Sequence, residues 1–435
     1  MVAELTPPLD DARLAARRAI EALRSGVPNH DAVRALGAGT PAIEDRFVAL
    51  LAEAHERGTE PLPQSGFLVA GNFGSGKSHL LEHLQQLALE RSFVVSKVVI
   101  SKETPLYDPA KLFRAAIAAA RAPGRLGPAL PQVAAALQAS RGERYMDFYA
   151  WVQQSRELNG RFAASLYLHD HAQGDQELQE RVLAFWSGDP IQIGELKRAL
   201  KAQGERSTYT FDKIDPRGLA YQRFRFAARM ILAAGYLGWV LLIDEAELIG
   251  RYSLPQRARS YAEIGRWTGS LRTEAYPGIL SVFALTTDFE RSVLDDRHDR
   301  ENVPARLRAT GRPADELIAA NAERGIRMIA KPYRLPPPSR ALIRRTYEHL
   351  RGLHGLAYAW EPPQVGSAPA ATSTSMREYV RWWITEWDLT RLDPSYRPSL
   401  EVTHLTPDLS EDAEMEAPSE GSADPPTLPD GDATG

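Results

Sequence analysis

Short apolar runs alternate along the chain with longer stretches in which apolar residues recur three and four positions apart. The first pattern is typical of buried strands and the second of amphipathic helices. Five runs are expected as strands, at residues 67–70, 93–100, 239–243, 279–285 and 326–330. Helical stretches separate them, and all but the second are apolar enough to be buried. The pattern therefore predicts an α/β fold with a largely parallel sheet and helices on both of its faces.

The remaining chain divides into further helical parts. The second and third strands lie too far apart for one crossover, so we interpret residues 120–215 as a helical insertion. The last part of the chain is rich in Pro, Gly, Ser and acid, which predicts a disordered tail. The expected parts are an N-terminal helical preface at 1–57, a core at 58–335, a small helical lid at 336–398 and an acidic tail at 399–435.

Composition and charge exclude several classes of function. The chain has no cysteine, which excludes a disulfide framework, a thiol nucleophile, an iron–sulfur cluster and any zinc site built on Cys ligands. The net charge is −4, but residues 401–435 hold ten acidic and no basic side chains, so the rest is mildly basic. That excess is too small to identify a nucleic-acid-binding protein. Without a signal peptide or a long apolar run, we expect a cytoplasmic protein that does not enter a membrane.

Residues 71–78, GNFGSGKS, match the complete P-loop pattern. GFLVA before the loop predicts a strand and HLLEHLQQLALE after it a helix, which is the context that this motif requires. Glycines let backbone N–H groups curl around phosphate oxygens at a helix N-terminus. The alternative is a glycine-rich turn with an incidental lysine. The residues expected to contact ATP are Gly71, Asn72, Phe73, Gly74, Ser75, Gly76, Lys77, Ser78 and His79.

The third predicted strand ends in WVLLIDE, which places an acid at the tip of a buried apolar strand. Such an acid needs a cation or a donor, so Asp244 is expected to hold Mg²⁺ together with the Ser78 hydroxyl. Glu245 is then the expected base that orients or deprotonates the attacking water, while Lys77 contacts the β- and γ-phosphates. The alternative is that DEAE is a solvated helix start.

Polar residues also end the fourth predicted strand, GILSVFALTTD. Thr286 or Thr287 could hydrogen-bond the γ-phosphate or the attacking water, and Thr287 is our choice. The alternative is an ordinary threonine at a strand end. HLLEH at 79–83 formally matches a zinc-peptidase signature, but we expect this helix to serve the nucleotide because it begins at Lys77.

With these motifs in hand, the chain resembles the AAA+ ATPases. More closely, GNFGSGKSHLLEHLQ, VVSKVVISKETPLYDPAKLFRAAI and GWVLLIDEAELIGRYSLPQRARSYAEIGRW are similar to the BrxD-type ATP-binding proteins of BREX phage-resistance systems, over about residues 15–388. The resemblance implies a five-stranded sheet in the order 5-1-4-3-2. It also implies a cytoplasmic ATPase that acts with a larger ATPase, a DNA methyltransferase and a phosphatase-like protein.

The same resemblance implies further site residues. Arg377 matches a lid arginine that touches the γ-phosphate, and Val27 and Pro28 are expected near the adenine. The BrxD-type proteins are relatives of origin-recognition ATPases, which usually carry a DNA-binding winged helix after the lid. Only about 50 residues separate Arg340 from Arg391 and an acidic tail follows, so we do not expect a winged helix in this sequence. We therefore expect DNA contact through partners, if at all.

A homo-oligomer is also expected, in which an arginine between Arg297 and Arg308 reaches the γ-phosphate of a neighbouring subunit. The segment VPARLR places Arg306, our first choice, and Arg308, our second, after a proline that could open a short helix. A solvated charge run is the alternative. For the whole chain we expect a magnesium-dependent ATPase that acts as a switch. A scaffold that binds ATP without efficient hydrolysis, or a small-molecule phosphotransferase, is the alternative.

Overall fold

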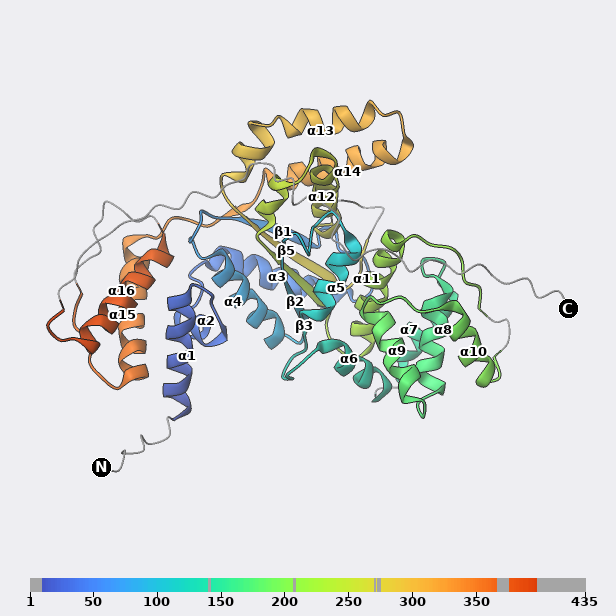
Figure 1. The fold of residues 1–435 in the computed structure, drawn as a ribbon, viewed down its shortest axis with the longest axis horizontal. Coiled ribbons are helices and arrows are strands. Elements are labelled where there is room, and N and C mark those ends of the chain that lie inside the picture. The colour runs from blue at the N-terminus through green and yellow to red at the C-terminus, as the bar shows by residue number, and fades with distance from the viewer. Residues whose placement is uncertain are drawn as a thin grey trace.

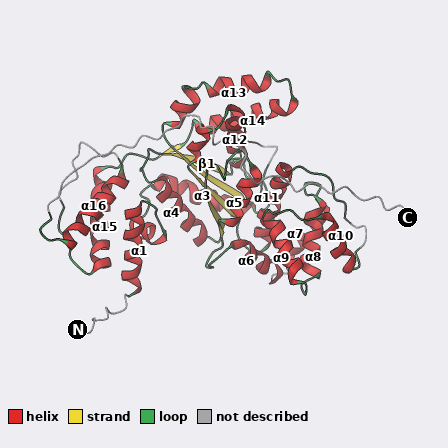
Figure 2. Ribbon diagram, in the orientation of Figure 1, coloured by secondary structure: helices red, strands yellow, loops and turns green. Residues whose placement is uncertain are grey.

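The computed structural model describes residues 10–139, 142–205, 209–269, 271, 275–365 and 375–396. Its centre is a six-stranded sheet in the order β3-β2-β4-β5-β1-β6, surrounded by helices (Figures 1 and 2). All neighbouring strands run parallel except β3, which pairs antiparallel with β2. The strands are β1 (Gly66–Ala70), β2 (Val94–Val99), β3 (Ala120–Arg121), β4 (Trp239–Asp244), β5 (Ile279–Leu285) and β6 (Tyr333–Arg334).

The five-stranded order 5-1-4-3-2 is wrong in its strand count and at both edges of the sheet. The four earlier runs do form neighbouring strands β1, β5, β4 and β2. The fifth, at 326–330, instead ends helix α14 (Pro313–Ile329), because Ile326 and Ile329 continue the helical spacing of buried Ala319 and Ala322. The edge position is taken by β6, whose two residues pair with Val69 and Ala70. Strand β3, with two residues, is too short for an alternation of apolar and polar residues to reveal it in the sequence.

Alternating residues of the strands enter two separate cores, as expected for a sheet covered on both faces. On one face, strand residues pack against α3 (Pro41–Arg57) and α4 (Lys77–Glu90). The other face packs against α5 (Pro109–Ala118), α11 (Pro216–Ala233), α12 (Leu254–Trp267) and α14. Between β4 and α12 lies the 3₁₀ helix η1 (Ala246–Arg251). The π-helix η2 (Glu290–Asp295) and α13 (Asp299–Arg308) follow β5.

In its described residues, the region predicted as a helical insertion contains five helices between β3 and α11. They lie on the opposite side of the sheet from the C-terminal helices (Figure 1). The helices are α6 (Ala129–Ala139), α7 (Glu143–Gln154), α8 (Gly160–His171), α9 (Gln176–Ser187) and α10 (Ile193–Ala202). Aromatic side chains join α8 and α9 to α11: Phe162 and Trp186 contact Phe226 of α11, and Phe185 contacts Phe162.

The N-terminal and C-terminal helices pack against each other (Figure 1). Helix α1 (Asp11–Ser25) lies beside α2 (His30–Leu36), α15 (Arg340–Tyr358) and α16 (Met376–Leu392). Ile20 of α1 shares a core with Leu350 of α15 and Trp387 of α16, and Arg24 forms an ion pair with Asp388. The predicted acidic tail at 399–435 lies outside the described residues. In the described ranges, every helix is too short or too polar to cross a membrane.

A buried ion pair holds α13 against α12. Arg257 Nε donates to Asp299 Oδ2 at 2.7 Å and its Nη2 to Oδ1 at 3.0 Å, while the Tyr261 hydroxyl donates to Oδ2 at 2.6 Å. The Arg257 side chain is 3% exposed and that of Asp299 0%. Breaking such a pair leaves an uncompensated charge in a region of low dielectric.

We therefore expect Asp299→Ala to destabilise the protein by about 3–5 kcal/mol. Chemical denaturation measures this loss. Glu301→Gln, on the exposed face of the same helix, is the control and should change the midpoint little. Equal midpoints for the two variants would contradict the role of this pair.

Candidate nucleotide-binding site

The P-loop joins the end of β1 to the start of α4, with the strand and helix that its sequence predicts. Gly74 and Gly76 have φ angles of 73° and 100°, in the left-handed region that favours glycine. A Cβ at Gly71 would lie 2.4 Å from Ser75 Oγ and 2.8 Å from Leu335 Cδ1. The first turn of α4 has no side-chain cap. Its N–H groups therefore face the loop as an anion site.

Lys77 is buried in this loop, where its side chain is 7% exposed. Its Nζ donates to the Gly71 carbonyl at 3.0 Å and lies 3.6 Å from Glu247 Oε1. Burial of an ammonium group is costly unless anions or acceptors surround it. The loop thus holds a positive charge ready for an anionic ligand.

The acidic end of β4 lies at the same edge of the sheet. Asp244 is the last residue of the strand, is buried, and accepts a hydrogen bond from the Glu245 N–H at 3.0 Å. Glu245 has a φ of 57°, a left-handed conformation that is uncommon outside glycine and is often found at functional sites. Burial and the charge of Asp244 raise the pKa of Glu245, against the opposing charges of Lys77 and Arg377.

The end of β5 completes this edge. Leu285 pairs with Ala70, and its carbonyl accepts a hydrogen bond from the Gly71 N–H at 3.1 Å. Thr287 donates to Asn72 Oδ1, so the predicted threonine contacts the P-loop through its side chain. Thr286, the alternative, is buried.

Three polar atoms at this edge are buried without a hydrogen-bond partner in the described part of the chain: Ser75 Oγ, Glu247 Oε2 and Thr286 Oγ1. Buried polar atoms are normally paired, and their presence around an anion-binding loop fits a bound polar ligand. The chemistry of the donors also fits Mg²⁺, which is commonly held by one or two carboxylates and by substrate phosphates. Asp244 and Ser78 are the oxygen donors here. Across the described ranges no cluster of three or more His, Asp or Glu residues could form a dedicated metal cage.

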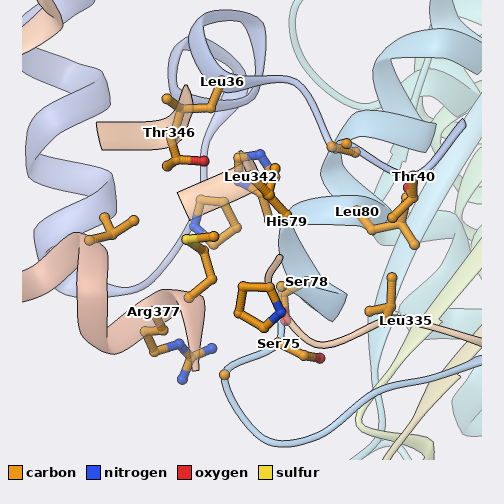
Figure 3. Close-up of a pocket in the computed structure, with 18 of the residues that line it drawn as sticks. Leu36, Thr40, Ser75, Ser78, His79, Leu80, Leu335, Leu342, Thr346 and Arg377 are labelled. Atoms are coloured by element: carbon orange, nitrogen blue, oxygen red, sulfur yellow. The ribbon is translucent and has the colours of Figure 1, made fainter. Parts of the chain in front are cut away.

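A largely apolar pocket extends from the P-loop to the packed terminal helices (Figure 3). Ser75 and Arg377 lie toward one end, and Leu36 and Thr346 toward the other. The pocket is lined by parts of α1, the α2–α3 connection, the P-loop, residues 335–338, α15 and α16. Its form suits a nucleotide, with phosphates at the glycine-rich end and an apolar base at the other.

The family described as BREX system ATP-binding protein BrxC/D matches residues 12–134 and 152–298, which together are more than half of the chain. The chain belongs to this family. No curated protein and no solved structure matches it. The matched residues include the P-loop, Asp244, Glu245 and Thr287, whereas Arg306 and Arg377 lie beyond them.

In this BrxC/D-family chain the start of α16 contacts the tip of the P-loop. Ser375 Oγ donates to the Gly74 carbonyl at 3.0 Å, and the Arg377 N–H donates to the same oxygen at 3.3 Å. The Arg377 guanidinium lies 5.1 Å from the centre of the Phe73 ring. The predicted lid arginine therefore lies beside the loop, about 300 residues away in sequence.

The two residues predicted near the adenine are placed differently. Pro28 lines the pocket, whereas Val27 is outside its lining and is 69% exposed. His79 also lines it, and its Nε2 lies 2.8 Å from the Gly37 carbonyl. Burial lowers the pKa of His79. His83 instead faces Glu44 at 3.2 Å, so the two histidines of HLLEH have separate partners.

Arg306 is exposed on α13 and has no partner among the described residues. Arg308, the second choice, forms ion pairs with Glu316 at 3.0 Å and Glu323 at 2.8 Å. The prediction that Pro304 opens this helix is wrong, because α13 begins five residues earlier and contains Pro304. The buried partners of Asp299 fix the first turn there.

Sequence reasoning missed several residues that the structure brings to the site. The sequence suggests for Glu247 only a place in a solvated helix start, DEAE, yet it is buried against Lys77. Ser375 and the pocket-lining residues Leu342 and Thr346 carry no motif. The repeated acid in DEAE, directly after a buried strand, is the signal that could have found Glu247.

Proposed function

We propose that this BREX-associated, ATP-binding chain hydrolyses ATP in its P-loop and acts as a nucleotide-driven switch in phage defence. The observation that supports the proposal best is the shared edge of β1, β5 and β4. There the P-loop lysine, a buried aspartate, a glutamate of raised pKa and two threonines meet at one place. A site that only binds nucleotide has no need of Glu245.

Each residue has a role in this mechanism. Backbone N–H groups of the loop and Lys77 bind the phosphates, and the apolar end of the pocket, with Pro28, takes the base. Bound Mg²⁺ would neutralise developing charge on the phosphates, with Asp244 and the Ser78 hydroxyl holding it. Glu245 accepts the proton of the attacking water, and Thr287 positions that water or the γ-phosphate. Arg377 closes over the γ-phosphate from the lid.

The test of this function is release of phosphate from ATP by the purified chain. Release of phosphate from ATP that depends on Mg²⁺ supports hydrolysis by this chain. Chelation of the metal should abolish that release. Tight binding of ATP without turnover, alone and with its BREX partners, would instead support a scaffold. The proposed partners are a larger ATPase, a DNA methyltransferase and a phosphatase-like protein, and the proposed location is the cytoplasm.

We further propose that the active form is a homo-oligomer in which Arg306 acts on the neighbouring subunit's ATP. A guanidinium that reaches the γ-phosphate stabilises charge in phosphoryl transfer, with an effect of ~10³ or more. Arg306 is the better candidate for this role, because Arg308 already forms ion pairs with Glu316 and Glu323.

Mixing two inactive variants tests this proposal. Arg306→Ala retains its P-loop and Lys77→Ala retains its arginine, so a mixed oligomer rebuilds one complete site. We expect each variant alone to be inactive and the mixture to recover ATPase activity. Full activity of Arg306→Ala alone, or no recovery in a mixture that demonstrably co-assembles, would contradict it.

A further inference from the structure

A third acidic residue, Glu247, lies against the P-loop lysine, although the mechanism proposed above does not use it. Its side chain is 5% exposed, and its Oε1 lies 3.6 Å from Lys77 Nζ. Its Oε2 is buried without a hydrogen-bond partner in the described ranges. The negative charge of Glu247 is therefore stabilised mainly by the positive charge of Lys77.

The local backbone explains how Glu247 reaches the site. The left-handed conformation of Glu245 ends β4 sharply, and η1 begins at Ala246. The Leu248 N–H donates to the Glu245 carbonyl, which closes the first turn of this 3₁₀ helix. Two residues after Glu245, the chain has therefore turned back so that Glu247 is buried beside the loop.

Lys77 has a limited number of donors to share. An ammonium group has three N–H donors, and in Lys77 one is used by the Gly71 carbonyl while another side of the group faces Glu247. ATP phosphates need the same positive charge. Glu247 and the phosphates are both anionic, so they repel each other across the ammonium group.

We propose that Glu247 competes with the phosphates of the nucleotide for Lys77 and thereby lowers the affinity of the site for nucleotide. The proposal rests on the placement of ATP phosphates against Lys77 given above. In the absence of nucleotide, Glu247 holds the buried ammonium in place. When phosphate binds, the charge of Lys77 is shared, and Glu247 is left with weaker compensation.

The ionisation of Glu247 supports this competition. Burial raises its pKa to about 7, against the opposing charge of Lys77. The other charged groups that face it are Asp244 and Glu245 at the end of β4, which both raise its pKa further. A bound phosphate acts in the same direction as these acids. Binding near pH 7 should therefore be accompanied by proton uptake at Glu247.

The test compares Glu247→Gln with the parent for binding of ADP and of a non-hydrolysable ATP analogue, both with Mg²⁺, by calorimetry at about pH 8.5, where Glu247, with a pKa of about 7, is ionised in the nucleotide-free protein. The amide keeps the size of the side chain and removes its charge. We expect dissociation constants about tenfold lower or more, because one anion near the phosphates is lost. Glu247→Ala should change affinity in the same direction, which keeps the test valid if one variant folds poorly.

Glu143→Gln, at the exposed start of α7, is the matched control for removal of one negative charge, and its affinity should equal that of the parent. Titration near pH 7 in two buffers of different ionisation enthalpy measures proton uptake. Uptake should be present in the parent and in Glu143→Gln, and smaller in Glu247→Gln. Unchanged or weaker affinity in folded Glu247 variants, or unchanged proton uptake, would overturn the proposal.

Nucleotide binding by Lys77→Ala distinguishes failure of the phosphate placement from failure of the competition by Glu247. If Lys77→Ala binds nucleotide as the parent does, the phosphate placement itself is wrong. If Lys77→Ala loses binding while the Glu247 variants match the control, the phosphate placement stands and only the competition by Glu247 is refuted.

Discussion

Lys77→Ala is expected to lower the affinity for ATP by about 100-fold or more while the protein stays folded. Lys77 is the cation of the P-loop, and its Nζ is held by one carbonyl and one carboxylate of the site itself. Removal of the side chain therefore takes away charge-assisted contacts to phosphate without opening a hydrophobic core, and Glu247, whose pKa is already raised to about 7, can take up a proton instead of remaining an unpaired buried charge. Calorimetric titration with ATP measures the change, and thermal unfolding checks the fold.

Lys197→Ala is the matched control, because Lys197 is an exposed lysine on α10 in the helical insertion. Its affinity for ATP should equal that of the parent. If Lys77→Ala and Lys197→Ala bind ATP equally well, the nucleotide does not lie in this loop.

Glu245→Gln is expected to slow ATP hydrolysis by about 10²- to 10⁴-fold while ATP binding is retained. The amide cannot accept the proton of the attacking water, but Lys77, Ser78 and Asp244 are unchanged. A steady-state phosphate-release assay measures the loss, and Glu143→Gln serves again as the control.

In the parent, Glu245 must be ionised to act as base. Because its pKa is raised, hydrolysis should fall on acidification at a higher pH than for an ordinary glutamate.

The local parts of this site could be predicted from the sequence because their determinants are adjacent. The strand, glycine-rich loop and helix around Lys77 lie within one short segment, and Asp244 ends an apolar run. The side chain of Thr287 also lies beside the loop, as the parallel arrangement of β5 and β1 leads one to expect. In these cases local periodicity and the geometry of a parallel sheet are sufficient.

The parts that were missed depend on packing between distant segments. Ser375 reaches Gly74 only because the start of α16 packs against the loop, and no motif marks it. Residues 326–330 look like a strand in isolation, but Ile326 and Ile329 are held by the core beneath α14. Pro304 would be expected at a helix start, yet buried Asp299 fixes the start of α13 earlier. Tertiary contacts override local preference at each of these places.

The fate of bound nucleotide in Glu245→Gln tests the central claim most directly. Radiolabelled ATP is incubated with the parent and the variant in the presence of Mg²⁺, the complexes are isolated, and the bound nucleotide is identified. We expect the parent to yield ADP and phosphate, whereas Glu245→Gln retains intact ATP at similar occupancy. Conversion of ATP to ADP by the variant at the rate of the parent would contradict the assignment of Glu245 as the base.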